Sequence, residues 1–391
     1  MAPRRTRPQV ASSLQQLVVG KEIVVTCGSG GVGKTTTAAA LGTMAATHLG
    51  LKVLVLTVDP ARRLASALGL EAFGNVETRV GPEAFAGSGL EPRGELWAAM
   101  LDTKQSWDDL VRRHAPDAST RDAILANPLY QNVTGKFVQS HDYIAMERLY
   151  DLHTSGAYDL IVVDTPPTRN ALDFLEAPER MADFFSSRLL RWLLAPYRSR
   201  LMTMASRPFY QLADRILGSA FLEDIAEFFI LFQSMYDGFV ERARAVERVL
   251  EDRRTTFVVV STLESAPLEE AEFFIEALAE RDLHLGAVVL NKVLPDYLLD
   301  PGSIKVAKRL CAEPAAVTKA LGDAARQPEL VERVVHEVGE SFLNFSVVAT
   351  REAAQRADLG VAPEAVVSVP YFDTDIYDLA GLVRLGRQLW R

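Results

Sequence analysis

Short runs of apolar residues alternate with longer stretches of helical periodicity along most of this chain. The apolar runs, which we interpret as buried strands, cover residues 22–27, 52–58, 95–101, 158–163, 256–261, 285–290 and 365–369. Helical patterns follow several of these runs, at residues 34–48, 137–155, 267–281 and 376–390. Strands that alternate with helices are typical of a mostly parallel sheet covered on both faces. The pattern therefore predicts an α/β fold with a doubly wound sheet.

Two stretches depart from this alternation. Residues 178–254 have helical periodicity and many large apolar side chains, and residues 303–358 are also rich in helical pattern. We expect the first to be an inserted helical subdomain and the second a helix-rich stretch, both within one domain that spans residues 20–391. The apolar side chains of 178–254 fit either an interior helix face or a hydrophobic groove. Residues 1–19 begin basic and contain no apolar core, so we expect a disordered leader and no secretory signal.

The segment between the first predicted strand and the first predicted helix has the spacing of a phosphate-binding loop (P-loop). Gly28, Gly33, Lys34 and Thr35 form G-x-x-x-x-G-K-T in the strand–helix context that this motif requires. Glycines let successive N–H groups point to one place, and the helix N-terminus adds partial positive charge. We expect Lys34 to reach the β- and γ-phosphates of ATP and the Thr35 hydroxyl to bind Mg²⁺. The expected nucleotide contacts in this segment are Gly28, Ser29, Gly30, Gly31, Val32, Gly33, Lys34, Thr35 and Thr36.

Two carboxylates follow predicted strands and are candidates to serve the P-loop. Asp164 ends the run at 158–163, where a carboxylate can hold Mg²⁺, partly through its water shell. Asp59 ends the run at 52–58 and is a candidate to bind the same ion or to orient the attacking water. The residues after Asp164 form either a switch loop that senses the γ-phosphate or a static turn. They are Thr165, Pro166, Pro167, Thr168 and Arg169.

Composition narrows the classes of partner and of metal site. The chain has 391 residues and a net charge of −9, which argues against nonspecific binding to nucleic acid. Two cysteines far apart, Cys27 and Cys311, make neither a CxxC zinc site nor a disulfide framework, so we expect no zinc and a cytoplasmic location. No stretch approaches the roughly 18–20 apolar residues that a membrane span needs.

Five sequence blocks resemble, in order and spacing, the ArsA-like ATPases of the deviant Walker A group, most of all the actinobacterial anion-transporting type. The blocks are CGSGGVGKTTTAAALG, TVDPARRLASALGL, DLIVVDTPPTRNALDFLEAP, FVVVSTLESAPLEEAEFFIEAL and VVLNKVLP. The resemblance implies that Asp59 is the catalytic aspartate of the first switch and that Asp164 is the Walker B residue. It also implies that Glu264 lies near nucleotide at a dimer interface and that Asn291 reads adenine. The segment from Pro370 to Asp373 falls where the family covers the adenine.

The chain departs from the family pattern at the P-loop and at both switches. The family's signature lysine, which reaches the partner's phosphates across a dimer, is replaced by Ser29, and serine cannot neutralise charge on the transferred phosphoryl group. Either the ATPase is slow, or a related chain that carries the lysine completes a heterodimer. Arg169 and Asn170 stand where relatives have Gly-His in the second switch. Arg169 is therefore either a replacement cation or a surface residue. Arg62 and Arg63 likewise stand where many relatives have His-Ser in the first switch.

The sequence thus predicts an Mg-ATP-dependent ATPase that works as a homodimer or heterodimer and couples ATP hydrolysis to a conformational switch. A hydrophobic cargo or a membrane-linked transport partner is expected, with a location that is cytoplasmic or peripheral to a membrane. Two alternatives stay open: a pseudo-ATPase subunit of a heterodimer, and more weakly a ParA-like partitioning ATPase, which would have to bind DNA. Lys34, Asp59 and Asp164 are the predicted catalytic residues.

Overall fold

The computed structural model describes most of the chain. The described residues are 13–58, 62–70, 74–131, 138–166, 227–232, 235–322, 326–358 and 363–390, with the single residues 176, 180 and 183. The predicted residues Asp59, Pro167, Thr168 and Arg169 therefore lie outside the described residues, as does most of the stretch 178–254.

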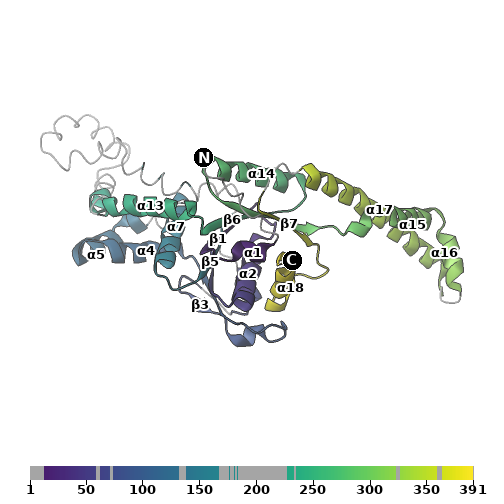
Figure 1. Cartoon of the computed structure of the whole chain (residues 1–391), viewed down its shortest axis with the longest axis horizontal. Helices are drawn as coiled ribbons and strands as arrows, with labels where there is room; N and C mark the ends of the chain where they lie inside the picture. Colours follow the sequence, from purple (N-terminus) through teal and green to yellow (C-terminus); the bar gives the residue numbers. More distant parts are fainter. Residues whose placement is uncertain are drawn as a thin grey trace, which may run out of the picture.

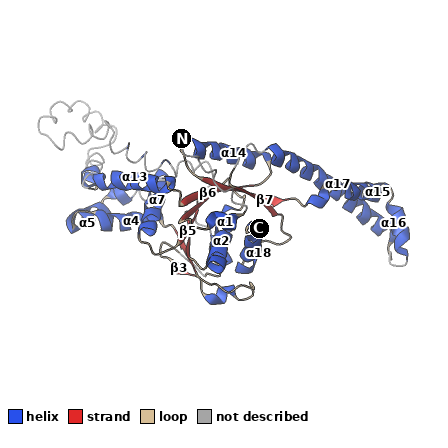
Figure 2. Ribbon diagram, in the orientation of Figure 1, coloured by secondary structure: helices blue, strands red, loops and turns tan. Residues whose placement is uncertain are grey.

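Eight strands form one sheet at the centre of the described structure (Figure 2). They are β1 (Ile23–Cys27), β2 (Lys52–Thr57), β3 (Thr78–Arg79), β4 (Glu95–Met100), β5 (Leu160–Asp164), β6 (Thr255–Ser261), β7 (Leu285–Val293) and β8 (Ala365–Pro370). The strand order is β3-β4-β2-β5-β1-β6-β7-β8. Every pair is parallel except β3 with β4. The predicted mostly parallel sheet is confirmed.

Helices cover both faces of the sheet because the central strands are apolar on both sides. In β1, Ile23 and Val25 belong to one buried cluster and Val24 to the other. The first cluster is completed by α4 (Thr103–His114), α5 (Ala118–Ala126), α7 (Val138–Thr154), α13 (Tyr236–Glu251) and α14 (Ser265–Glu280). The second is completed by α1 (Leu14–Val18), α2 (Lys34–Met44), α3 (Arg62–Ala67) and α18 (Leu379–Leu389). The doubly wound α/β fold is thereby confirmed.

The described part of the stretch 178–254 packs into the core. Phe228, Phe232, Met235 and Phe239 are buried, and Phe232 and Phe239 stack with ring centroids 5.4 Å apart. Both rings also contact Trp107 of α4. These side chains therefore form an interior helix face and no groove.

A helical arm extends away from the sheet at one end of the molecule (Figure 1). We use "arm" for α15 (Pro301–Ala312), α16 (Pro314–Leu321) and α17 (Pro328–Asp358). The 31 residues of α17 span about 46 Å at the α-helical rise. Its C-terminal part is fixed to the body, because the Leu294 N–H donates to Glu352 (3.1 Å) and Gln355 Nε2 donates to Ser265 Oγ (2.9 Å).

Candidate functional site

The loop between β1 and α2 has a backbone that only glycine adopts easily. Gly28, Gly31 and Gly33 have φ angles of 151°, 81° and 99°. A Cβ atom at Gly28 would clash with the Val260 carbonyl, and one at Gly33 would clash with the Asn291 side chain. All three positions thus require glycine because of the backbone angle. Gly28 and Gly33 also require it because β6 and β7 approach closely, whether or not a ligand is bound.

The N-terminus of α2 is available to an anion. Its N-cap is Gly33, which supplies no side-chain hydrogen bond, and no acidic side chain lies in the first turn. The first N–H groups of a helix have no partners within the helix, and the macrodipole favours negative charge there. Lys34 is buried and its Nζ donates to the Ser29 carbonyl (3.0 Å), which folds the ammonium back along the loop. This end of α2 therefore combines N–H groups that have no partner within the helix with an ammonium group.

Asp164 joins three elements at the carboxyl edge of the sheet. Its carboxylate is fully buried, and Oδ2 accepts from Thr35 Oγ1 (2.6 Å) and from Thr57 Oγ1 (3.1 Å). Strand pairing sets this arrangement, because Asp164 is in register with Thr26 of β1 and with Thr57 of β2. A hydroxyl and a carboxylate are hard oxygen ligands of the kind that Mg²⁺ prefers, so Thr35 and Asp164 fit an Mg²⁺ site. Thr57 was not predicted from sequence, although it ends a strand beside Asp164.

The predicted switch loop is described only at its start. Thr165 is buried, and its hydroxyl hydrogen bonds to the Thr26 carbonyl (2.9 Å), which ties the loop to β1. Pro166 is the last described residue of this loop. The Val58 N–H donates to the Asp164 carbonyl (3.1 Å). Val58 directly precedes Asp59, the predicted residue of the first switch. The start of both predicted switches thus lies beside Asp164.

The end of β7 supplies two side chains to the P-loop. Asn291 Nδ2 donates to the Val32 carbonyl (2.7 Å), and Lys292 Nζ donates to the Gly31 carbonyl (3.1 Å). Lys292 has a φ of 59°, an uncommon backbone angle for a residue other than glycine. Its side chain is exposed, so the ammonium lies on the loop and in contact with solvent. Sequence reasoning missed Lys292, because neither its backbone angle nor its direction can be read from the residue alone.

Comparisons with known proteins agree with this geometry. A family model described as anion-transporting ATPase matches residues 21–317, which is most of the chain. The chain belongs to the anion-transporting ATPase family. An uncharacterised protein of Streptomyces coelicolor is 31% identical over 69% of the chain, and the match spans 62% of that relative. An "ATPase ASNA1 homolog" of Entamoeba dispar is 24% identical over 75% of this chain and 85% of its own length. An "ATPase GET3" of Malassezia globosa is 26% identical over 68% of this chain and 71% of its own.

Three further residues are predicted to contact nucleotide in this anion-transporting ATPase, namely Glu264, Pro370 and Thr36. All three lie at the same edge of the sheet as the P-loop. Glu264 is exposed and is the N-cap residue of α14, which follows β6. Pro370 is exposed at the end of β8, in register with Val293, and the next residue donates its N–H to the Val293 carbonyl (2.9 Å). The Pro370 segment therefore lies beside the strand that carries Asn291. Thr36 is half-buried in the first turn of α2.

The chain's two cysteines differ in environment. Cys27 is buried at the end of β1, and burial raises the pKa of its thiol to about 12. Cys311 is half-buried in the arm, and its Sγ donates to the His336 carbonyl (3.8 Å). Within the described part of the chain, no three metal-binding side chains of the His, Cys, Asp or Glu type cluster together. No described helix combines the length and the apolar character that crossing a bilayer requires.

Proposed function

We propose that this ATPase binds Mg-ATP at the loop Gly28–Thr36 and hydrolyses it to ADP and phosphate by in-line attack of water. The observation that carries the proposal is the hydrogen bond from Thr35 to Asp164 at the N-terminus of α2. It brings a hydroxyl and a carboxylate together beside the loop whose Ser29 carbonyl accepts from the Lys34 ammonium, at a helix end whose first N–H groups have no partner within the helix. Positioning and charge stabilisation supply most of the catalysis in phosphoryl transfer.

Each residue then has a distinct task. The loop N–H groups and Lys34 would bind the β- and γ-phosphates, and Thr35 and Asp164 would hold Mg²⁺, which would supply positive charge to the transferred group. Asp59 would orient the attacking water and bind Mg²⁺ in part through water; its place in the chain directly after Val58 supports this. Asn291 and the segment that begins at Pro370 bind the adenine, since an amide can both donate and accept.

Lys292 compensates in part for the absent signature lysine. Ser29 carries no charge, whereas the Lys292 ammonium lies against Gly31, within the same loop. A cation at this place can turn from the Gly31 carbonyl to a bound phosphate. This arrangement favours a chain that hydrolyses ATP slowly by itself over a pseudo-ATPase, which would bind ATP without hydrolysing it.

The nucleotide site works in a dimer that couples ATP binding to the two switches. The family resemblance supports a homodimer or a heterodimer with a related chain, with Glu264 at the interface. A hydrophobic cargo or a membrane-linked transport partner in the cytoplasm completes the proposal. The described residues 227–232 and 235–254 pack into the core. The proposal that the chain binds a hydrophobic cargo therefore rests on the sequence of residues 178–226.

The test is steady-state phosphate release by the purified chain, alone and titrated with a related chain that carries the signature lysine. A rise that saturates near equimolar supports a heterodimer, and turnover that the partner leaves unchanged supports a homodimer. Asp59→Asn separates binding from chemistry, because it is expected to keep ATP affinity and stop turnover. If the chain binds ATP but releases no phosphate, either alone or with the partner chain, the proposed enzymatic activity is contradicted and the chain is a pseudo-ATPase.

A further inference from the structure

One arginine side chain contacts three successive residues of the loop between β8 and α18. From α18, Arg384 Nη2 donates to the Thr374 hydroxyl (2.7 Å) and to the Thr374 carbonyl (3.3 Å). The guanidinium also lies over the Phe372 ring, 4.9 Å from its centroid, and Nη1 lies 4.0 Å from Asp373 Oδ1. A planar cation with several donors can stack and hydrogen bond at the same time. Arg384 therefore joins residues 372–374 to α18.

The helix that carries Arg384 is itself fixed against α2. Gly386 approaches α2 so closely that a Cβ there would meet the Met44 side chain. Leu382 and Leu385 are buried in the same apolar cluster as α2. Because α2 begins at the P-loop, Arg384 connects the loop after β8 to the helix whose N-terminus is the proposed phosphate site.

The loop that Arg384 holds begins beside Asn291. Pro370 pairs with Val293 of β7, and the Tyr371 N–H donates to the Val293 carbonyl (2.9 Å). Asn291, two residues before Val293, donates to the Val32 carbonyl of the P-loop (2.7 Å). Residues 370–374 are thus fixed at one end by strand pairing and at the other end by the arginine.

This loop has one anchored aromatic side chain and one exposed aromatic side chain. Phe372 is half-buried, packs against the apolar cluster that includes α2, and lies under Arg384. Tyr371, directly before it, is 63% exposed. An exposed aromatic ring can stack on a base, and an amide such as that of Asn291 can donate to a base and accept from it. The loop therefore offers groups of the kind that bind a base, at a place that Arg384 determines.

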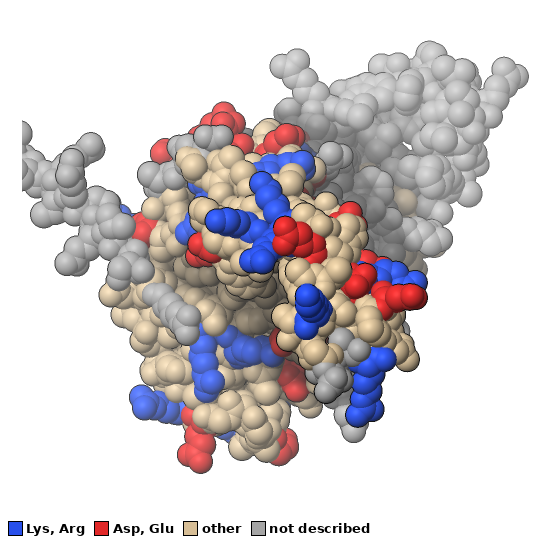
Figure 3. Space-filling view, turned by 90° about the vertical axis from the view of Figure 1, so that its right-hand side faces the viewer, with Lys and Arg blue, Asp and Glu red and all other residues tan. Residues whose placement is uncertain are grey.

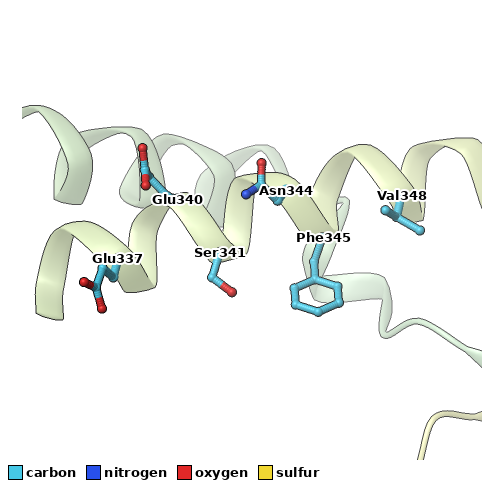
Figure 4. A pocket seen from close by; sticks show the side chains of 6 residues that line it. All are labelled: Glu337, Glu340, Ser341, Asn344, Phe345 and Val348. Atoms are coloured by element: carbon cyan, nitrogen blue, oxygen red, sulfur yellow. The ribbon is translucent and has the colours of Figure 1, made fainter.

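The arm fits a base less well. A shallow pocket on the outward face of α17 is lined by residues of that helix alone, from Glu337 to Val348 (Figure 4). A site that buries most of a small ligand needs walls on more than one side. Seen from the arm end, basic and acidic side chains are interspersed over the described surface (Figure 3), and a surface of mixed sign does not steer an anion. The loop after β8 is therefore the better base site.

We propose that Arg384 is a positioning residue of the nucleotide site, which holds residues 370–374 where they contact the base. The inference rests on the proposed function, in which Asn291 and the segment that begins at Pro370 bind adenine while the phosphates lie at the P-loop. Arg384 acts through the loop and makes no contact with the nucleotide itself.

Loss of the arginine should therefore affect the base and spare the phosphates. Without Arg384 the loop keeps only its fixed end at β8, so it occupies the base-binding conformation for a smaller fraction of the time. Apparent affinity falls in proportion to that fraction, so a fraction of about one-tenth weakens ATP binding about tenfold. Hydrolysis of bound ATP is not changed, because the chemistry takes place at the other end of the nucleotide. The KM for ATP is then raised while kcat stays the same.

The experiment measures dissociation constants for Mg-ATP and Mg-GTP, which share phosphates and ribose and differ in the base. The wild type is expected to prefer ATP, and Arg384→Ala to weaken ATP binding about tenfold and GTP binding less, with a matching rise in the KM for ATP. Arg384→Lys keeps a charge over Phe372 and loses the forked hydrogen bonds, so its affinity should lie in between. The matched control is Arg387→Ala, an exposed arginine on the same helix, which should behave as the wild type does.

Thr374→Val tests the same contact from the loop side, in case Arg384→Ala lowers the melting temperature. It keeps the shape of the side chain, removes the hydroxyl acceptor, and is expected to weaken ATP binding by a smaller factor. Wild-type ATP affinity in both variants, or an equal loss of ATP and GTP affinity in Arg384→Ala, would overturn the inference. If that result comes with loss of ATP binding in Lys34→Ala, the proposed function stands and only the inference fails. A wild type that binds neither nucleotide would overturn both.

Discussion

Thr35 donates its hydroxyl to Asp164 over 2.6 Å, which joins the first turn of α2 to the end of β5. The carboxylate is fully buried and also accepts from Thr57, so three elements of the fold converge on one side chain. Neither hydroxyl carries a formal charge. In the proposed site, the Lys34 ammonium and a bound Mg²⁺ would add positive charge beside the carboxylate.

Asp164→Asn is expected to lower ATP turnover on the order of 10²-fold, because the amide keeps the shape of the side chain and loses the charge that holds Mg²⁺. Phosphate release measured across a range of Mg²⁺ concentrations checks this. Glu269→Gln, an exposed change on α14, is the matched control. Wild-type turnover with an unchanged Mg²⁺ dependence in Asp164→Asn would remove this residue from the metal site.

Gly33→Ala is expected to destabilise the chain by about 1–3 kcal/mol, since its φ of 99° strains any side chain and its Cβ would strike Asn291. Thermal unfolding without nucleotide measures the effect on the fold alone. Gly30→Ala, three residues away, has open space around its Cβ and serves as control. Equal melting temperatures for the two variants would show that the loop backbone is not fixed as described.

The strands were predictable because each central strand is a short run of apolar residues, buried on both faces. Thr78–Arg79 of β3 was missed, since two polar residues that pair antiparallel at the sheet edge leave no apolar run. Helix α14 begins at Ser265, earlier than the predicted residue 267, because Pro267 lies in its first turn, where proline is tolerated. The predicted helix at 34–48 changes to a π-helical turn at Ala45–Leu49.

The site was predictable where a motif fixes the residues, and less so where the fold brings separate strands together. Asp164 and Asn291 both contact residues of the P-loop segment, and their roles toward nucleotide stay predictions. Lys292 reaches the loop only because of its positive φ, and Thr57 reaches Asp164 through strand register. The outward face of α17 was not anticipated, because the same periodicity also fits a helix that is buried in a core.

Lys292→Ala is expected to lower kcat about tenfold and to change KM less, because its ammonium would act on charge that develops during transfer. The kinetics of the variant check this, with Lys305→Ala on the exposed face of α15 as control. Adding Ser29→Lys to Lys292→Ala is expected to recover turnover. A kcat equal to that of the wild type would make Lys292 a structural residue of the loop.

Thiol reactivity should distinguish the two cysteines. At pH 8, one thiol per chain, that of Cys311, is expected to react rapidly with a disulfide reagent such as 5,5′-dithiobis(2-nitrobenzoate), while Cys27 reacts only on unfolding. Burial holds the pKa of Cys27 at about 12, so only about 10⁻⁴ of it is thiolate at that pH. Rapid reaction of two thiols in the folded chain would contradict the packing of β1.

The most direct test of the account is Mg²⁺-dependent phosphate release by the purified chain, compared with Lys34→Ala at matched concentration. The account predicts slow, saturable turnover in the wild type that disappears without Mg²⁺ and in the variant, together with loss of ATP binding by the variant. Undiminished ATP affinity and turnover in Lys34→Ala would contradict the assignment of the nucleotide site to the loop between β1 and α2.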